Sequence, residues 1–166
     1  MMRVIVMGVS GSGKSSVGAA LAEKLGLPFL EGDTLHPRSN VEKMSAGTPL
    51  TDEDRWPWLD LIGARLAQAP DGIVISCSSL KKIYRDRLRQ AAGSSLCFIF
   101  LDGSLADLRE HMGHRTGHFM PLSMLDSQLA TLEPPTGEPL VLRQDIAQPI
   151  DRIVEASAAW LRNGRG

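Results

Sequence analysis

A glycine-rich segment near the N-terminus carries the clearest chemistry in this sequence. Residues 8–15 read GVSGSGKS, which matches the pattern G-x-x-x-x-G-K-[ST] of phosphate-binding loops. Glycines let the backbone curl until successive N–H groups point at one anion, and a following helix adds the positive end of its dipole. The motif therefore predicts a nucleoside triphosphate site. The residues expected to hold the nucleotide are Gly11, Ser12, Gly13, Lys14, Ser15 and Ser16.

Two side chains of this loop have separate expected roles. Lys14 would reach the β- and γ-phosphates as a point charge, and the Ser15 hydroxyl would bind Mg²⁺. A second charged group, Asp33, follows a short apolar segment at residues 29–31. If that segment is a strand beside the first strand, the Asp33 carboxylate lies near the transferred phosphoryl group.

The Asp33 carboxylate could act in several ways. It could take the proton of an acceptor hydroxyl, or orient that hydroxyl for in-line attack. It could also hold a magnesium-bound water, or simply form a turn or helix cap.

Arg115 lies in the glycine- and proline-containing segment 113–121. We expect this segment to close over the triphosphate, so that Arg115 stabilises the charge on the transferred group. Lys14, Asp33 and Arg115 are therefore the candidate catalytic residues.

Three cations follow the third predicted strand at helical spacing. Lys81, Arg85 and Arg89 are four residues apart, so they would lie on one helix face. Such a row suits an anionic acceptor, and a guanidinium suits a carboxylate. The alternative is a solvated basic face, paired in part with Asp86.

Two histidines, His36 and His118, are candidate donors to sugar hydroxyls. Neither has metal-ligand spacing with another His or with Cys, so we expect no metal site built by protein ligands alone.

The elements that must position these residues alternate between strand and helix patterns. Unbroken apolar runs, typical of strands buried on both faces, are separated by segments of helical periodicity. This predicts an α/β fold in three layers, with a mainly parallel five-stranded sheet and ligands beyond the carboxyl ends of its strands. Strands are expected at 3–9, 29–31, 73–75, 96–101 and 140–142, and helices at 14–25, 51–69, 81–92, 105–112, 122–132 and 150–161.

The 166 residues fit a single phosphate-loop kinase domain. We expect its core at 1–31, 71–112 and 138–166, an acceptor-binding flap at 32–70 and a lid at 113–133. The formal net charge of −1 gives no reason to expect a nucleic-acid partner. The N-terminus lacks signal-peptide features and no apolar run could span a bilayer, so we expect a cytoplasmic protein with no membrane partner. Cys77 and Cys97 are expected to be buried thiols.

Two classes of phosphate-loop protein fit poorly. The Asn-Lys-x-Asp motif with which GTPases read guanine is absent. Motor and transporter ATPases usually carry an acid at the end of an apolar strand, whereas the third strand here ends in Ser76-Cys77-Ser78. A compact kinase for a small acceptor remains.

The sequence resembles the small phosphate-loop gluconokinases. The resemblance rests on GVSGSGKSSVG at 8–18, EGDTLHPRSNVEKMSAGTPLTDEDRWPWL at 31–59, SCSSLKKIYRDRLR at 76–89, and RTGHFM with LDSQLATLE between 115 and 133. It implies an NMP-kinase-like fold, ATP and Mg²⁺ as cofactors, D-gluconate as acceptor, 6-phospho-D-gluconate as product, and often a homodimer. By the same resemblance Asp33 faces the acceptor hydroxyl, the helix of Arg85 faces gluconate, and Arg115 and His118 belong to the lid.

Other functions stay open at this point. Shikimate or adenylylsulfate would be alternative small anionic acceptors for the same kind of kinase. A nucleotide-bound interaction protein without turnover is disfavoured, because Lys14, Asp33 and Arg115 are all present. The sequence departs from the family pattern at Ser79, where Ala is commoner, and matches only loosely after Glu133.

Overall fold

A five-stranded, all-parallel sheet forms the centre of the molecule. The computed structural model describes residues 2–113 and 122–163. All four strand pairings are parallel, so every strand presents its carboxyl end at one edge of the sheet. This confirms the predicted α/β fold with a parallel sheet. Across the sheet the strands are β2 (Phe29–Glu31), β3 (Gly72–Ser76), β1 (Met2–Met7), β4 (Cys97–Asp102) and β5 (Val141–Asp145).

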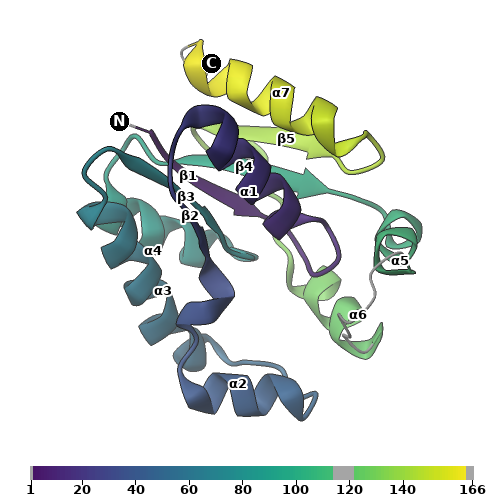
Figure 1. Ribbon diagram of the computed structural model, residues 1–166. Helices are drawn as coiled ribbons and strands as arrows, with labels where there is room; N and C mark the ends of the chain where they lie inside the picture. The colour runs from purple at the N-terminus through teal and green to yellow at the C-terminus, as the bar shows by residue number, and fades with distance from the viewer. Residues whose placement is uncertain (1, 114–121, 164–166) are drawn as a thin grey trace.

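Helices cover both faces of the sheet and complete three layers (Figure 1). One apolar core lies under α1 (Lys14–Leu25) and α7 (Ile150–Arg162), and the other under α3 (Asp52–Gln68) and α4 (Lys82–Ala92). The remaining long helices, α5 (Leu105–Gly113) and α6 (Leu122–Thr131), lie near the carboxyl ends of the strands. Within 2–113 and 122–163, no helix is both long enough and apolar enough to cross a membrane.

The polar stretch 32–54 contains two elements that the sequence did not predict. These are the 3₁₀-helix η1 (Gly32–Leu35) and helix α2 (Arg38–Ser45), which projects from the body of the molecule in Figure 1. Helix α3 then begins at a capping box between Thr51 and Asp54. Its apolar face is fully buried against the sheet. Within the segment 32–70, α2 is thus the part that projects, and α3 packs in the core.

The position of β2 corrects one expectation. Strand β2 does not lie beside β1, because β3 lies between them. The burial pattern gives the reason: β3 is buried at all five residues, as a central strand must be, whereas the three residues of β2 are only half-buried. The end of β2 still packs closely on β3, since a Cβ at Gly32 would lie 2.0 Å from the Ser76 carbonyl oxygen. Only glycine permits this approach.

Candidate active site

The predicted phosphate-binding loop connects β1 to α1 in the required geometry. Gly8, Gly11 and Gly13 have φ angles of 150°, 83° and 93°, a region that favours glycine. Gly13 caps α1 without a side-chain hydrogen bond, so no cap side chain occupies the helix N-terminus. The Ser12 side chain is buried, and its hydroxyl has no hydrogen-bond partner within the part of the chain described. An uncompensated polar group here fits a phosphate ligand, and Ser16 is exposed in the first turn of α1.

Lys14 lies over the phosphate loop, and its charge and that of Asp33 both influence Cys77, the residue after β3. The Lys14 ammonium donates to the Val9 carbonyl at 3.0 Å and so bends back over the loop. The pKa of the Cys77 thiol is raised to about 12, mainly by burial. The negative charge of Asp33 adds to this increase, whereas a hydrogen bond with Ser79 and the positive charge of Lys14 oppose it. The charges of Lys14 and Asp33 therefore both reach this thiol. Cys77 and Cys97 are buried thiols that are not joined in a disulfide, as predicted.

Glu31, at the end of β2, is a site residue that the sequence analysis missed. One oxygen of its carboxylate accepts a hydrogen bond from the Ser15 hydroxyl, and the other accepts one from Ser76 at the end of β3. A signal was available, because an acid ends a predicted strand two residues before Asp33. Hydroxyl and carboxylate oxygens are the ligands that Mg²⁺ prefers.

Asp33 and His36 face each other across η1, but they differ in exposure. The Asp33 side chain is 67% exposed, whereas that of His36 is 3% exposed. The His36 ring stacks on Trp58 with centroids 4.0 Å apart, and the Trp58 indole N–H donates to the Gly32 carbonyl at 2.9 Å. Asp33 is thus placed to meet a ligand, while His36 is largely buried behind it.

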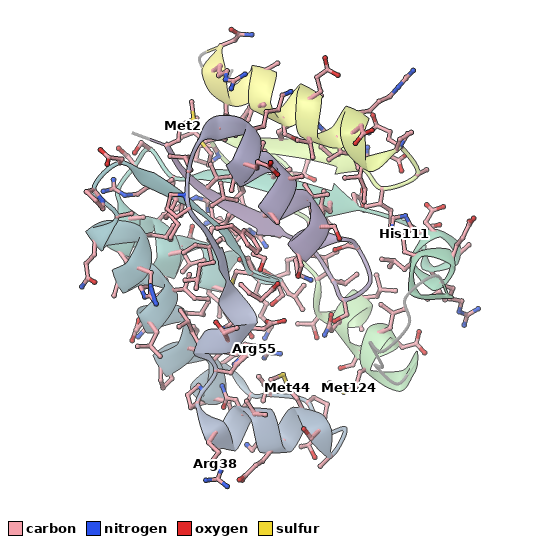
Figure 2. All side chains as sticks on the ribbon, in the orientation of Figure 1. Met2, Arg38, Met44, Arg55, His111 and Met124 are labelled. Carbon is pink, nitrogen blue, oxygen red and sulfur yellow. The ribbon has the colours of Figure 1, made fainter. Side chains whose placement is uncertain are left out.

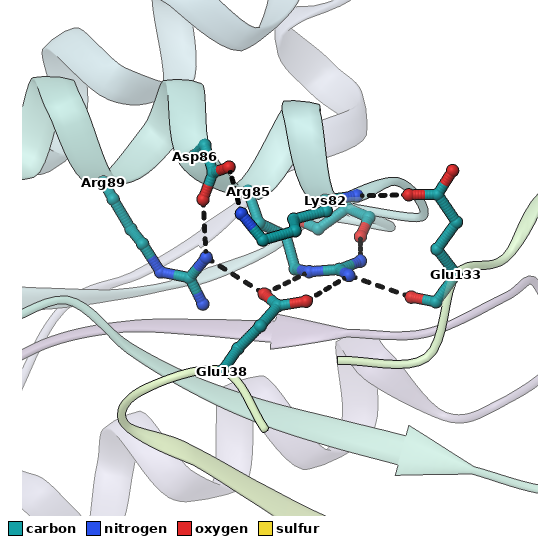
Figure 3. A network of polar contacts seen from close by, with 7 residues as sticks. Lys82, Arg85, Asp86, Arg89, Glu133 and Glu138 are labelled. Atoms are coloured by element: carbon teal, nitrogen blue, oxygen red, sulfur yellow. Dashed lines mark hydrogen bonds and ion pairs between the residues drawn. The ribbon is translucent and has the colours of Figure 1, made fainter. Parts of the chain in front are cut away.

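The predicted row of free cations is not what the structure shows (Figure 3). Arg85 is completely buried, and its guanidinium is bound within the protein. Its Nε and Nη2 donate to the Glu138 carboxylate at 2.9 and 2.6 Å, while Nη1 donates to the Ser79 carbonyl at 2.8 Å. Nη2 also donates to the Glu133 carbonyl at 2.9 Å. Arg85 is therefore bound by groups of the protein itself, and sequence spacing could not reveal these distant partners.

The other two cations of the row are also paired with acids. Arg89 binds Asp86 and Glu138 through Nη1, each at 3.0 Å, and its side chain is 16% exposed. Lys81 immediately precedes α4 and binds Asp52 at 3.1 Å, with 30% of its side chain exposed. Lys81 is thus the most accessible of the three cations.

The buried network around Arg85 supports the loop between β3 and α4. Arg85 binds the carbonyl of Ser79, whose φ of 51° is strained for a residue other than glycine. The adjacent Ser78 carbonyl accepts a hydrogen bond at 3.3 Å from the backbone N–H of Gly8, where the phosphate loop begins. The Glu133 carboxylate caps α4 through the Lys82 N–H at 2.9 Å. Arg85 therefore stabilises the loop between β3 and α4, which in turn contacts the start of the phosphate loop.

Helix α6 also contacts the phosphate loop. The backbone N–H of Ser10 donates to Oε1 of Gln128 at 2.8 Å, although the two residues are 118 positions apart. The sequence analysis did not single out Gln128, because nothing local links it to the loop. Arg115 and His118 lie outside the described residues.

A pocket of about 380 Å³ lies beyond the carboxyl ends of β4 and β5. It lies between α5 and the segment that leads into α7. Two of its lining residues are joined by a hydrogen bond of 3.0 Å between the His111 ring and the Ile146 carbonyl. The lining residues are Asp107, Glu110, His111, Ile146, Ala147, Gln148, Pro149 and Ile150.

Known proteins are similar to this sequence over most of its length. A protein-family model described as an AAA domain matches residues 4–135. A gluconokinase from Gluconobacter oxydans is 48% identical over 92% of this chain and 86% of its own. The thermoresistant gluconokinase of Escherichia coli is 43% identical over 97% of this chain and 94% of its own.

Solved structures share the fold. The crystal structure of a gluconokinase from Sinorhizobium meliloti superposes with a TM-score of 0.92 at 57% identity, covering 98% of this chain and 92% of that one. An APS kinase from Mycobacterium tuberculosis, solved with AMPPNP and APS, has a TM-score of 0.67 at 22% identity over 97% of this chain and 98% of its own. The second likeness shows a common fold and no more.

The Arg85–Glu138 pair makes a prediction about stability. Burial opposes ionisation of Glu138, but hydrogen bonds from Arg85 and Arg89 outweigh it and hold its pKa below the usual value. Glu138→Gln leaves the buried Arg85 charge poorly compensated and should lower the free energy of unfolding at pH 7 by about 3 kcal/mol. Urea denaturation measures this loss.

The matched control is Glu42→Gln, which removes the acid of an exposed pair with Arg38. This change should cost less than about 0.5 kcal/mol. The lowered pKa of Glu138 stabilises the fold at pH values above the pKa that Glu138 has in the unfolded chain, near 4.5. This stabilisation is lost as the pH falls through the lower pKa of the folded state. The loss of unfolding free energy caused by Glu138→Gln should therefore become smaller in acid. Equal losses for both variants would contradict a bracing role for Glu138.

Proposed function

Because this chain belongs to the gluconokinase family, we propose that its site transfers the γ-phosphoryl group of ATP to D-gluconate and forms 6-phospho-D-gluconate. The observation that carries this proposal is the hydrogen bond between Ser15 of the phosphate loop and Glu31, which lies two residues before the exposed Asp33. The three relatives described above that bear the name gluconokinase are 43–57% identical to this chain. The likeness to APS kinase, at 22% identity, gives no support for adenylylsulfate as the acceptor.

The nucleotide would bind along the carboxyl edge of the sheet. The amides of the phosphate loop and the buried Ser12 hydroxyl would hold the phosphates, with Lys14 neutralising their charge. The pocket beyond β4 and β5 is large enough for a purine base and has both apolar walls and polar edges. Pro149 and Ile150 supply apolar surface there, and Gln148 supplies an amide.

The residues around Ser15 fit a magnesium ion. Ser15 would coordinate it directly, and the Glu31 carboxylate would orient the Ser15 hydroxyl or hold a water of the ion. When bound, the ion neutralises charge on the phosphates. Within the described ranges, no cluster of three or more His, Cys, Asp or Glu side chains offers a second metal site.

The acceptor would lie between the γ-phosphate and η1. The exposed Asp33 carboxylate would accept or orient the proton of the gluconate 6-hydroxyl while its oxygen attacks phosphorus in line. Lys81 is the candidate partner for the gluconate carboxylate, because it is the most accessible of the three cations predicted to face the acceptor and it binds Asp52 in the first turn of α3. Its present partner, Asp52, also accepts a hydrogen bond from Tyr84, and Arg55 donates to the Tyr84 hydroxyl at 3.0 Å. Figure 2 shows Arg55 where α2 joins the body of the molecule.

The proposal includes the finer expectations of the family resemblance. These are a homodimer in the cytoplasm, an acceptor-binding flap at 32–70, and a lid at 113–133 that carries Arg115 and His118. The hydrogen bond between Gln128 and Ser10 supports communication between that lid and the phosphate loop.

The activity itself is measured by mixing the protein with MgATP and gluconate and following ADP release. Asp33→Asn should lower kcat by roughly 100-fold or more, the scale expected when a general base is removed. Lys14→Ala should abolish turnover. The control Asp71→Asn changes an exposed carboxylate in the turn before β3 and should retain activity. Absence of gluconate-dependent ADP, with turnover of shikimate or adenylylsulfate in an acceptor panel, would refute the assignment.

A second measurement concerns Glu31. Glu31→Gln should raise the Mg²⁺ concentration required for half-maximal activity about 10-fold, the lower end of the effect of altering a partner of a metal ligand. Glu23→Gln, at an exposed position on α1, is the matched control. If both variants have the Mg²⁺ requirement of the wild type, Glu31 does not support the metal site.

A third measurement tests the carboxylate partner. Lys81→Met should raise the KM for gluconate about 10-fold through loss of a charge-assisted contact, with little change in the KM for ATP. Lys82→Met is the matched control, because this neighbouring lysine is 60% exposed and binds Asp86 on the same helix. Equal gluconate KM values in the two variants would remove Lys81 from the acceptor site.

A further inference from the structure

The buried amide of Asn40 fixes the protonation of the His36 ring. Asn40 is 1% exposed, and its Nδ2 donates to the Asp54 backbone carbonyl at 2.9 Å. Because a carbonyl can only accept, this contact determines which end of the amide is nitrogen. The same Nδ2 lies 3.1 Å from Nδ1 of His36. Nδ2 can only donate, so Nδ1 must accept, and a neutral His36 carries its proton on Nε2.

The protonated Nε2 faces the candidate catalytic carboxylate. It lies 3.9 Å from Oδ1 of Asp33, beyond hydrogen-bond length, but the exposed Asp33 side chain can rotate to close the gap. The imidazole cannot move as easily, because it stacks on Trp58 with an interplanar angle of 17°. Trp58 is in turn tied to the backbone of Gly32, next to Asp33.

The charges around the ring agree with a neutral imidazole. Burial lowers the pKa of His36, Asp33 on η1 raises it, and Arg55 on α3 lowers it, with a net downward shift. The Asp54 carboxylate, also on α3, is bound to Lys43 and to the Thr51 backbone. These contacts, led by that with Lys43, lower the pKa of Asp54 to about 2.

We propose that neutral His36 is a positioning residue for Asp33. Its Nε2–H donates a hydrogen bond that aims the carboxylate at the acceptor hydroxyl, and Asn40 selects the tautomer that makes this possible. No proton leaves His36. The hydroxyl proton goes to Asp33, the hydroxyl oxygen bonds to the γ-phosphorus, and the bond from that phosphorus to the β–γ bridging oxygen breaks, releasing ADP. The inference rests on the proposed function and replaces direct contact between His36 and the sugar.

The first test reads the tautomer without any assay of activity. Two-bond ¹H–¹⁵N spectra of the full chain with labelled histidine are recorded from pH 6 to 8, and His36→Gln assigns the signal. We expect Nε2 protonated and Nδ1 unprotonated throughout. A proton on Nδ1, or a ring that becomes an imidazolium near its ordinary pKa, would overturn the proposal.

The second test compares two amide replacements. The nitrogen of Gln can occupy the place of Nε2, and that of Asn the place of Nδ1, so only His36→Gln keeps the donor toward Asp33. Relative to wild type, we expect His36→Gln to retain kcat within about 3-fold and His36→Asn to lose about 10-fold or more, the loss coming from a misplaced base. The KM for ATP should stay unchanged in both.

A double variant separates positioning from folding. If His36 acts through Asp33, His36→Asn should cause little further loss of kcat in an Asp33→Asn background. Equal losses in the two His36 variants, or full additivity with Asp33→Asn, would overturn the proposal. If the wild type shows no gluconate-dependent ADP release, the proposed function fails, while the tautomer measurement still decides the assignment of the proton.

Discussion

The contact on which the site depends is the sharing of the Glu31 carboxylate between Ser15 and Ser76. It joins the first turn of α1 to the ends of β2 and β3, three segments that are distant in sequence. Gly32 follows with no side chain, so β2 can press against β3. Asp33 is only two residues beyond Glu31. Its distance from the phosphate loop is therefore set by this contact, although a whole strand separates β2 from β1.

Two rigid supports lie behind this arrangement. On one side, buried Arg85 binds Glu138 and holds the loop that meets Gly8. Such buried pairs add little net stability, but removal of one partner is costly, so they fix geometry more than they strengthen the fold. On the other side, the stacked ring of His36 backs Asp33. The exposed groups of the site thus rest on buried polar contacts within the protein.

Much of the fold was predictable because its signals are local. The phosphate loop is a contiguous motif, and buried strands and amphipathic helices follow simple periods, so the five strands and most helices match the prediction. The segment 32–45 was not predictable in this way, because η1 and α2 are short and polar, and neither buries an apolar side chain completely. Arg85 shows a deeper limit: its spacing defines a helix face, but its partner Glu138 is 53 residues away. Glu31, in contrast, could have been predicted from the sequence, because it is an acid at the end of a strand. The contacts of Asn40 that set the tautomer of His36 could be found only in the three-dimensional structure.

A crystal structure with gluconate and a non-hydrolysable ATP analogue would test the central claim most directly. The account predicts the gluconate 6-hydroxyl oxygen about 3–3.5 Å from the γ-phosphorus, the separation of reactants poised to react. The same oxygen should lie within hydrogen-bond distance of the Asp33 carboxylate, with Glu31 still beside Ser15. Gluconate bound with its 6-hydroxyl directed away from both Asp33 and the phosphate loop, in a closed complex, would contradict it.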